Sequence, residues 1–568
     1  MRPNRHIPSS GEPAIMKPLL ILAAALSATS ALAQTLPPAV DPGALQQRRI
    51  DEEERRRQLE QLERREITDP VRREAAPPPP AARPAGEAVR FMVREIRFTE
   101  SAILPAEKLA ELARPYTGRE LALAELRDLT TRIDEAYRER RVVTARAVIP
   151  PQDVSDGIVD IRLVEGRVGG IAVEGNASTD TDFITRRIGL VPGELVDLPA
   201  LEQDLRRFNR TQDAQLRADL AAGQRFGTSD LKILVEEPPR HSLRLSLDNG
   251  GSEGSGEWRT GLQYTNRSLL GFRDELSLGV VGAEGQESYS VGYSFPVNRS
   301  GGRLSLAAYK DHVEIENGPL RELGISGRST GTVVALRQPV HLGERSRTDL
   351  VLGSKRRETR NWISSIPLQE TQTVDGHLGV EHQAADDHGY WIATYTLTAG
   401  RAKGFERSNY TLGRAFVRRI QALAPGWSAQ ASLNYQHSGH SPLPSGEQLQ
   451  IGGEYSVRGY PVGVWSGDRG FIASLELHHP LGELAAAEGR PGARATGFFF
   501  ADHGRVTPDR APNSLEPQHR QLGSAGWGVR AAIGERVDAR LTFARAFNRL
   551  PDEDRRYQVH FMLVAEFM

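Results

Sequence analysis

The stretch YQVHFMLVAEFM, residues 557–568, has a strict two-residue period. Its odd-numbered positions are apolar or aromatic, whereas its even-numbered positions are mixed. The apolar set is Tyr557, Val559, Phe561, Leu563, Ala565 and Phe567. Successive side chains of a β-strand point to opposite faces, so this stretch predicts a strand with one continuous apolar face.

The same alternation runs back through the whole C-terminal half of the chain. Period-two segments recur from Arg240 onward and are separated by turns rich in Gly, Asn, Asp and Pro. About 16 such strands fit into residues 239–568, and an even number is typical of outer-membrane barrels. We therefore predict a transmembrane β-barrel of antiparallel strands, with its apolar side toward lipid and its polar side toward a lumen.

A soluble β-sandwich is the alternative fold for this region. A single sandwich of this length is unusual, because such domains are normally much shorter. The last strand also favours the barrel, since an aromatic residue near the C-terminus after alternating apolar residues resembles the signal by which barrels are recognised for membrane insertion. Phe561, Leu563 and Phe567 carry that signal, and Met568 after Phe567 is a small departure from it.

The first 33 residues predict export. A basic residue, Lys17, precedes a short apolar run that ends in Ala31-Leu32-Ala33. This order is typical of a secretory signal peptide over residues 1–33, cut after Ala33, with Met16 as the expected initiator. A membrane anchor is the alternative, but the apolar run is shorter than the about 18 residues that spanning requires.

The composition excludes several classes of function. Lys and Arg number 72 and Asp and Glu number 73, for a net charge of −1, so the chain has no general attraction to nucleic acid. Cysteine is absent, which removes disulfides, thiolate metal sites and cysteine nucleophiles. Beyond residue 34 there is no further long apolar stretch, so we expect an exported protein that is either soluble outside the cytoplasm or crosses a membrane as a β-barrel.

Two segments of unusual composition follow the predicted signal peptide. Residues 34–75 include RRIDEEERRRQLEQLERRE (48–66), in which opposite charges three and four residues apart favour a helix. A solvated or partly disordered segment is the alternative. Residues 76–90 include APPPPAARPAG (76–86), which predicts a stiff, extended linker.

Residues 91–238 contain one unit twice. Each copy opens with a strand, continues with two helices and ends with two strands, in the order β-α-α-β-β. A Val-Glu pair at 164–165 and again at 235–236 gives a repeat of about 71 residues. We predict two modules, 91–166 and 167–238. The longer helix of the first has an apolar face made of Leu126, Leu129, Ile133, Ala136 and Tyr137.

The stretch GGEYSVRGYPVG (452–463) places one arginine among glycines and aromatic residues. A signal peptide, a charged helix, two repeated modules and a 16-stranded barrel, in that order, resemble the outer-membrane transporters of two-partner secretion, the TpsB family. The modules resemble the POTRA domains of that family. VRGY is the hallmark of a long loop in the superfamily, carried here by Val457, Arg458, Gly459 and Tyr460. The resemblance implies a loop around 441–470 that folds into the barrel.

The resemblance also implies a partner for Arg458. TGFFFADHG (496–504) matches a G-F-x-x-x-D-like signature on a barrel strand after the loop, with Asp502 as the acid. Arg458 would then pair with Asp502 on the inner wall, because a guanidinium meets a carboxylate through two hydrogen bonds. Gly459 would let the backbone turn tightly beside the pair. The alternative is a solvated Arg458 and an Asp502 that is one of many lumen charges.

The sequence offers little support for an enzyme. A G-x-S-x-G pattern occurs at 250–254, but it lies between two predicted barrel strands instead of before a helix. His478 and His479 are adjacent on a strand and face opposite sides, so one metal could hardly bind both. With no P-loop and no distinct acid–base pair, we expect no catalytic, cofactor or metal site.

The resemblance implies export of one large protein across the outer membrane of a Gram-negative bacterium. The partner would be an unfolded exoprotein with an N-terminal secretion domain, of the haemolysin or adhesin type that forms a β-helix outside. Periplasmic POTRA domains would bind it, by strand addition to a sheet edge, and residues 46–66 would plug the pore. Outer-membrane lipid, the barrel assembly machinery and periplasmic chaperones are further expected partners. The alternatives are a barrel or lipid assembly factor of the same superfamily and a diffusion porin, which would need neither modules nor a locked loop.

Overall fold

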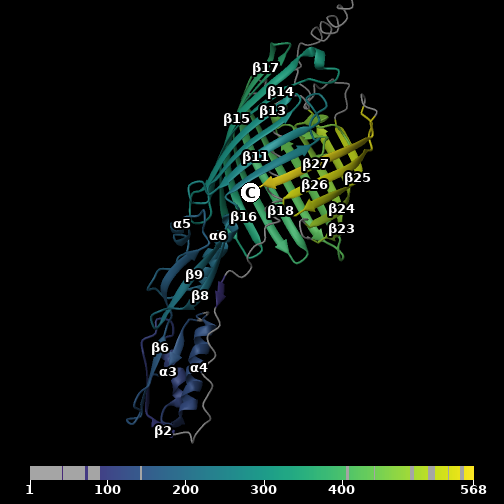
Figure 1. The fold of residues 1–568 in the computed structure, drawn as a ribbon. Helices are drawn as coiled ribbons and strands as arrows, with labels where there is room; N and C mark the ends of the chain where they lie inside the picture. Colours follow the sequence, from purple (N-terminus) through teal and green to yellow (C-terminus); the bar gives the residue numbers. More distant parts are fainter. Residues whose placement is uncertain are drawn as a thin grey trace, which may run out of the picture.

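The computed structural model describes residues 41, 71–73 and 90–567, with gaps at 141, 143, 405–408, 440–441, 486–491, 509–518, 535 and 551–554. The predicted signal peptide, the helix over 46–66, nearly all of the Pro-rich linker and Met568 lie outside the described residues. The molecule is elongated. Two modules extend one after the other from one end of a β-barrel (Figure 1).

The first module packs two helices on small sheets, as the repeat predicts. The longer helix buries the five residues predicted for its apolar face. The opening strand of the module is interrupted at Arg94, because the N–H groups of Arg94 and Glu95 both donate to the carbonyl of Gly157. A strand between the helices, β4, was not predicted, and it pairs with β2. The elements are β2 (Arg90–Val93), β3 (Glu95–Phe98), α3 (Ala106–Ala113), β4 (Arg119–Ala122), α4 (Leu123–Glu139), β5 (Arg146–Val148) and β6 (Ile158–Val164).

The second module has one four-stranded sheet in the order β1-β8-β9-β7. Its own elements are β7 (Arg167–Glu174), α5 (Thr181–Thr185), α6 (Leu198–Thr211), β8 (Gln215–Ala222) and β9 (Thr228–Glu236). The fourth strand, β1 (Val71–Arg73), comes from before the first module and pairs in parallel with β8. It is the short dark purple arrow beside β8 in Figure 1. Residues 71–73, at the end of the predicted N-terminal region 34–75, thus form a strand.

Sixteen antiparallel strands form a closed barrel, which confirms the predicted fold class. Hydrogen bonding between the first strand, β10, and the last, β27, closes the ring. The strands are β10 (His241–Asp248), β11 (Arg259–Arg267), β12 (Glu275–Ala283), β13 (Gln286–Pro296), β14 (Arg303–Glu314), β15 (Ile325–Leu342), β16 (Ser346–Ile363), β17 (Ile366–Asp386), β18 (Gly389–Lys403), β19 (Asn409–Ala422), β20 (Ser428–Ser438), β23 (Arg469–Leu484), β24 (Ala493–Thr507), β25 (Arg520–Ile533), β26 (Val537–Ala546) and β27 (Tyr557–Phe567).

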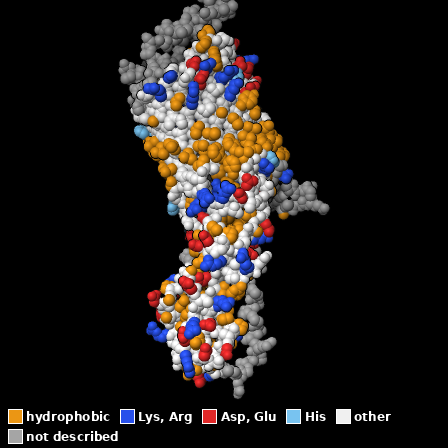
Figure 2. Space-filling view, turned by 90° about the vertical axis from the view of Figure 1, so that its left-hand side faces the viewer, with side chains coloured by type: hydrophobic (Ala, Val, Ile, Leu, Met, Phe, Trp, Pro, Cys, Tyr) orange, Lys and Arg blue, Asp and Glu red, His pale blue; other side chains and the backbone are white. Residues whose placement is uncertain are grey.

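The two faces of the barrel differ in polarity as the alternation predicts. Leu243, Leu245 and Leu247 of β10 are exposed on the outside, whereas charged residues such as Arg357 and Asp502 are buried inside. Figure 2 shows a belt of hydrophobic side chains across the face of the barrel in view, with charged side chains above and below it. Such a belt faces the hydrocarbon of a bilayer. Within the described ranges, none of the helices is long and apolar enough to span a membrane.

Strand β23 continues past Pro480 to Leu484. A register shift between Pro480 and Gly482 accommodates the residue, since a bulge tolerates the missing N–H of proline. The two histidines lie as predicted on opposite faces. His478 bonds Glu476 at 3.0 Å and His479 packs on the ring of Trp427.

A buried arginine joins the second module to the barrel. Arg273, in the turn between β11 and β12, is 1% exposed. Its Nε donates to Asp213 Oδ1 at 2.7 Å, its Nη2 to the other oxygen of that carboxylate, and its Nη1 to Ser178 Oγ at 3.2 Å. Asp213 follows α6 and Ser178 precedes α5, so this one guanidinium holds two segments of the module against the barrel rim.

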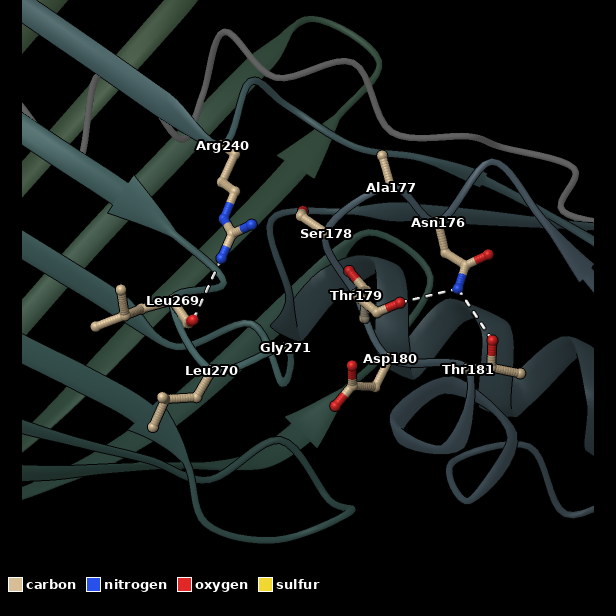
Figure 3. A pocket seen from close by; sticks show the side chains of 10 residues that line it. All are labelled: Asn176, Ala177, Ser178, Thr179, Asp180, Thr181, Arg240, Leu269, Leu270 and Gly271. Carbon is tan, nitrogen blue, oxygen red and sulfur yellow. Dashed lines mark hydrogen bonds between the residues drawn. The ribbon is translucent and has the colours of Figure 1, made fainter.

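An open cleft of ≈ 510 Å³ lies beside this joint (Figure 3). Hydrogen bonds fix both of its walls. Asn176 Nδ2 donates to the carbonyl of Thr179 at 2.9 Å, and Arg240 Nη2 to the carbonyl of Leu269 at 3.3 Å. The N–H of Asp180 donates across the joint to the carbonyl of Gly271 at 2.8 Å. The module is thus bound to the barrel through backbone as well as side-chain contacts.

Candidate functional site

The segment between β20 and β23 folds into the barrel. Because β10 leads away from the second module and strand directions alternate, this connection starts at the far end of the barrel. It contains a short antiparallel pair, β21 (Leu449–Ile451) and β22 (Trp465–Gly467). We call residues 442–468 the inward loop. It shares a buried apolar cluster with wall strands, formed by Ile451, Val457, Tyr460, Ile472, Val506, Leu522 and Ala546.

Arg458, near the tip of the inward loop, lies against Asp502 of β24. The Nε and Nη2 atoms donate to the two carboxylate oxygens at 2.7 Å each, and the backbone N–H of Arg458 donates to Oδ2 at 3.1 Å. The two residues are 3% and 4% exposed. The structure thus brings together the two residues that the sequence motifs associate, in the two-bond geometry expected of a guanidinium and a carboxylate.

The wall offers Arg458 more contacts than its sequence motif indicated. Glu476 of β23 accepts a hydrogen bond from Nη1 at 2.6 Å, and Ser474 accepts one from Nη2 at 3.1 Å. The guanidinium carbon lies 3.6 Å from the ring centroid of Phe500, a cation–π contact. Arg540 of β26 also reaches Glu476, at 3.4 Å. One cation is therefore held by two carboxylates, a hydroxyl and an aromatic face, from two adjacent strands.

The other three residues of the VRGY motif, Val457, Gly459 and Tyr460, hold the backbone of the loop close to the barrel wall. Gly459 has φ +87, and a Cβ there would lie 3.2–3.3 Å from atoms of Ala544 and Ala546 in β26. Tyr460 donates its hydroxyl to the carbonyl of Gly523 at 2.8 Å and is 1% exposed. Val457 is fully buried. Glycine alone fits this close, left-handed approach without strain.

A second anchor, Glu447, was not predicted. It is 0% exposed, in the part of the inward loop that precedes β21. Its carboxylate accepts hydrogen bonds from Lys355 Nζ at 2.8 Å, Arg357 Nη2 at 2.7 Å and Arg414 Nη2 at 3.1 Å. Gln436 of β20 also donates to its backbone carbonyl, at 2.8 Å. The only signal in the sequence is that Lys355, Arg357 and Arg414 occupy positions of the strand alternation that face the lumen. That signal does not identify Glu447 as their partner.

The two anchors lie on different parts of the wall. Arg458 binds β23 and β24, whereas Glu447 binds β16 and β19. Buried charges of this kind contribute little net stability, but removing one partner leaves the other uncompensated. The arrangement can therefore hold the loop at a fixed depth inside the lumen.

The predicted C-terminal signal residues lie on the outward face of β27. Phe567 is 46% exposed, and the ring of Phe561 packs on that of Trp258 with centroids 5.9 Å apart. Leu563 stands opposite Leu247 of β10. Their role in barrel recognition stays a prediction.

Comparison with known proteins gives the same picture from independent evidence. Residues 227–531, more than half of the chain, match the family described as haemolysin secretion/activation protein ShlB/FhaC/HecB, and residues 91–166 match the ShlB-type POTRA domain.

Individual relatives and structures agree with these matches. The chain is 23% identical to the heme/hemopexin transporter protein HuxB of Haemophilus influenzae (66% of this chain, 69% of the relative). It is 24% identical to the hemolysin transporter protein ShlB of Serratia marcescens (74% of each). The solved structure of CdiB from Escherichia coli superimposes with a TM-score of 0.62 at 20% identity, covering 92% of this chain and 98% of that one. This protein belongs to the ShlB/FhaC/HecB family of haemolysin secretion/activation proteins.

Proposed function

We propose that the protein carries an unfolded partner protein across the outer membrane in two-partner secretion. The barrel lies in the outer membrane of a Gram-negative bacterium, and the POTRA domains lie in the periplasm. Relatives are named as transporters of hemolysin and of heme/hemopexin. By that relationship the partner of this chain is a secreted exoprotein.

The observation that carries the proposal is the inward loop held by buried charges within the lumen. A loop anchored through Arg458 and Glu447 narrows the passage and gives it a fixed lining of hydrogen-bonding groups, which suits an extended polypeptide more than a folded cargo. The POTRA domains bind that polypeptide before it enters. Folding outside supplies the direction of transport, because the periplasm holds no nucleotide, and the proposal includes no catalytic step.

The finer features of the proposal concern the partner and the N-terminal region. The partner is of the haemolysin or adhesin type with an N-terminal secretion domain. Outer-membrane lipid contacts the hydrophobic belt, and assembly machinery and chaperones handle the barrel during biogenesis. Asp41 is buried in the barrel against Asn361 of β16, at 3.3 Å, which supports a lumenal position for its part of the chain. The plug helix over 46–66 lies outside the described residues and stays a prediction.

Co-expression tests the proposal. The chain is produced in a Gram-negative host without its own two-partner transporter, together with a candidate exoprotein that carries an N-terminal secretion domain, and the medium is assayed for that exoprotein. The proposal predicts its appearance outside only when the transporter is present. Retention of the protein in the periplasm, together with altered assembly of other barrels, would favour the alternative of an assembly factor.

A further inference from the structure

The cleft beside the joint has opposite charges on its two walls. Arg240, the residue before β10, lines it from the barrel, and Asp180, the residue before α5, lines it from the second POTRA domain (Figure 3). Both side chains are exposed. Arg240 donates one hydrogen bond, to the carbonyl of Leu269, so its other N–H groups are available, and the carboxylate of Asp180 does not cap the helix that follows it. Within the described part of the chain, neither charge has an ion-pair partner.

The cleft lies at the level where the surface of the membrane begins. Leu243 of β10 and Tyr264 of β11 are register partners on the lipid-facing side of the barrel. The hydroxyl of Tyr264 lies 2.8 Å from Nδ1 of His241, the first residue of β10. Tyrosine is typical of the boundary between hydrocarbon and water. Because Arg240 directly precedes His241, the cleft opens among the head groups of the periplasmic leaflet.

Two exposed leucines adjoin the polar walls. Leu269 and Leu270, in the turn between β11 and β12, are 38% and 60% exposed. Both side chains point away from Asp180 in Figure 3. Apolar side chains at the membrane surface insert into the boundary between head groups and acyl chains. The cleft therefore combines two charges with an apolar margin, which fits a ligand that has both kinds of surface.

The two walls are held in place without a ligand. Asn176 Nδ2 donates to Thr181 Oγ1 at 3.1 Å, and the N–H of Asp180 donates to the carbonyl of Gly271 at 2.8 Å. Gly271 has φ +88, and a Cβ there would lie 2.5 Å from the carboxylate of Asp180, so glycine allows the walls to approach each other. The volume of ≈ 510 Å³ is within the range of preformed sites for small ligands.

We propose that this cleft binds the head group of a phospholipid with a primary ammonium, such as phosphatidylethanolamine, from the periplasmic leaflet. Arg240 binds the phosphate, Asp180 accepts hydrogen bonds from the ammonium, and Leu269 and Leu270 contact the start of the acyl chains. A free phosphate or an anionic lipid fits less well, because it leaves Asp180 facing a second negative charge. The lipid bridges the POTRA domain and the barrel. The inference rests on the outer-membrane location of the barrel and not on the exported partner.

Native mass spectrometry of the purified full chain in detergent tests the proposal. The protein is titrated with phosphatidylethanolamine, phosphatidylcholine or phosphatidylglycerol of the same acyl chains, and the affinity for the first bound lipid is measured. We expect phosphatidylethanolamine to bind about ten-fold more tightly than phosphatidylcholine, whose methylated ammonium has no N–H to donate to Asp180. Equal affinities for the three lipids would overturn the proposal.

Two variants with matched controls assign the binding to the cleft. Asp180→Asn should lower the affinity for phosphatidylethanolamine to that for phosphatidylcholine, whereas Arg240→Gln should weaken binding of both lipids. The controls are Arg345→Gln and Asp387→Asn, which change an exposed ion pair on other turns of the same rim and should bind as wild type does. A preference for phosphatidylethanolamine that persists in Asp180→Asn would contradict the inference.

A head group without acyl chains distinguishes a lipid from a soluble phosphate compound. Glycerophosphoethanolamine has the same two charges but cannot contact Leu269 and Leu270 through acyl chains. We expect it to bind at least about ten-fold more weakly than the lipid, since the apolar contacts are lost. Equally tight binding of the two compounds would overturn the assignment of a lipid to the cleft.

Discussion

The guanidinium of Arg458 and the carboxylate of Asp502 face each other through two hydrogen bonds of 2.7 Å, inside the barrel and almost completely shielded from solvent. This pair joins the tip of a loop that begins at the outer end of the barrel to strand β24 of the wall. It depends on the planar shape of the guanidinium as much as on its charge.

Arg458→Lys should therefore destabilise the barrel although it keeps the charge. An ammonium cannot donate two parallel bonds to Asp502, nor can it stack on Phe500 as the guanidinium does. Breaking a buried ion pair lowers the free energy of unfolding by about 3–5 kcal/mol, and we expect Arg458→Lys to lower it by an amount toward that range. Thermal unfolding in detergent, followed by the change in gel mobility of the folded barrel, measures it. Arg360→Lys is the control, because Arg360 is half exposed in its ion pairs, and its unfolding temperature should not change.

Gly459→Ala should prevent the loop tip from docking. The residue has φ +87, and the new methyl group would lie 3.2 Å from the backbone nitrogen of Ala546. Secretion should fall strongly while the barrel still inserts. Gly482→Ala is the matched control in strand β23, because a Cβ there meets nothing within 4 Å. Equal secretion by the two variants would show that the close approach is unimportant.

Glu447→Gln should loosen the inward loop at its second anchor. The amide keeps the shape of the side chain but leaves Lys355, Arg357 and Arg414 without their shared negative charge. We expect faster protease cleavage within the loop of the purified barrel. Glu370→Gln, which changes a half-exposed carboxylate on β17, should leave the cleavage rate as it is. An unchanged rate for Glu447→Gln would mean that Arg458 holds the loop alone.

The joint between the second POTRA domain and the barrel should loosen in acid. Burial opposes ionisation of Glu237, but hydrogen bonds from Ser178 and Thr179 and the charge of Arg273 outweigh it and hold its pKa below the ordinary value. A lowered folded-state pKa contributes stability that is fully present above the unfolded pKa of about 4.3 and is lost as the pH falls through the folded value. The joint is thus stable at pH 5–8 and weakens below about pH 4.

Spin-label distances across the joint measure this transition. Labels at Arg225→Cys in the domain and Arg345→Cys at the barrel rim should give a narrow distribution at neutral pH and a broad one in acid. In Glu237→Gln the distance distribution should broaden less in acid, because the titrating carboxylate is gone. If the distribution of the Glu237→Gln variant broadened as much as that of the wild type, protonation of another group would be what loosens the joint.

The sequence predicted the barrel well because lipid and lumen impose opposite demands on alternate residues. Leu243, Leu245 and Leu247 face outward as their period requires, and the buried face of α4 consists of the five residues chosen by helical spacing. The Arg458–Asp502 pair was found from motifs and not from spacing, since 44 residues separate the two. No local pattern connects them.

Contacts that depend on tertiary structure could not be predicted. β1 is a strand because it pairs with the edge of β8, and its three residues are too few to show an alternation from which a strand could be predicted. Glu447 lies 92 residues from Lys355, and the barrel's closure alone makes these side chains neighbours. The bulge at Pro480 likewise depends on the pairing of β23 with β24. In each case the decisive partner is remote in the chain.

Secretion of the partner exoprotein by cells that produce wild type, Arg458→Ala or Asp502→Ala, with the amount of barrel in the outer membrane measured in parallel, tests the central claim most directly. The account predicts that both variants insert and that secretion collapses in each. Equal amounts of the partner in the medium of all three strains would contradict it.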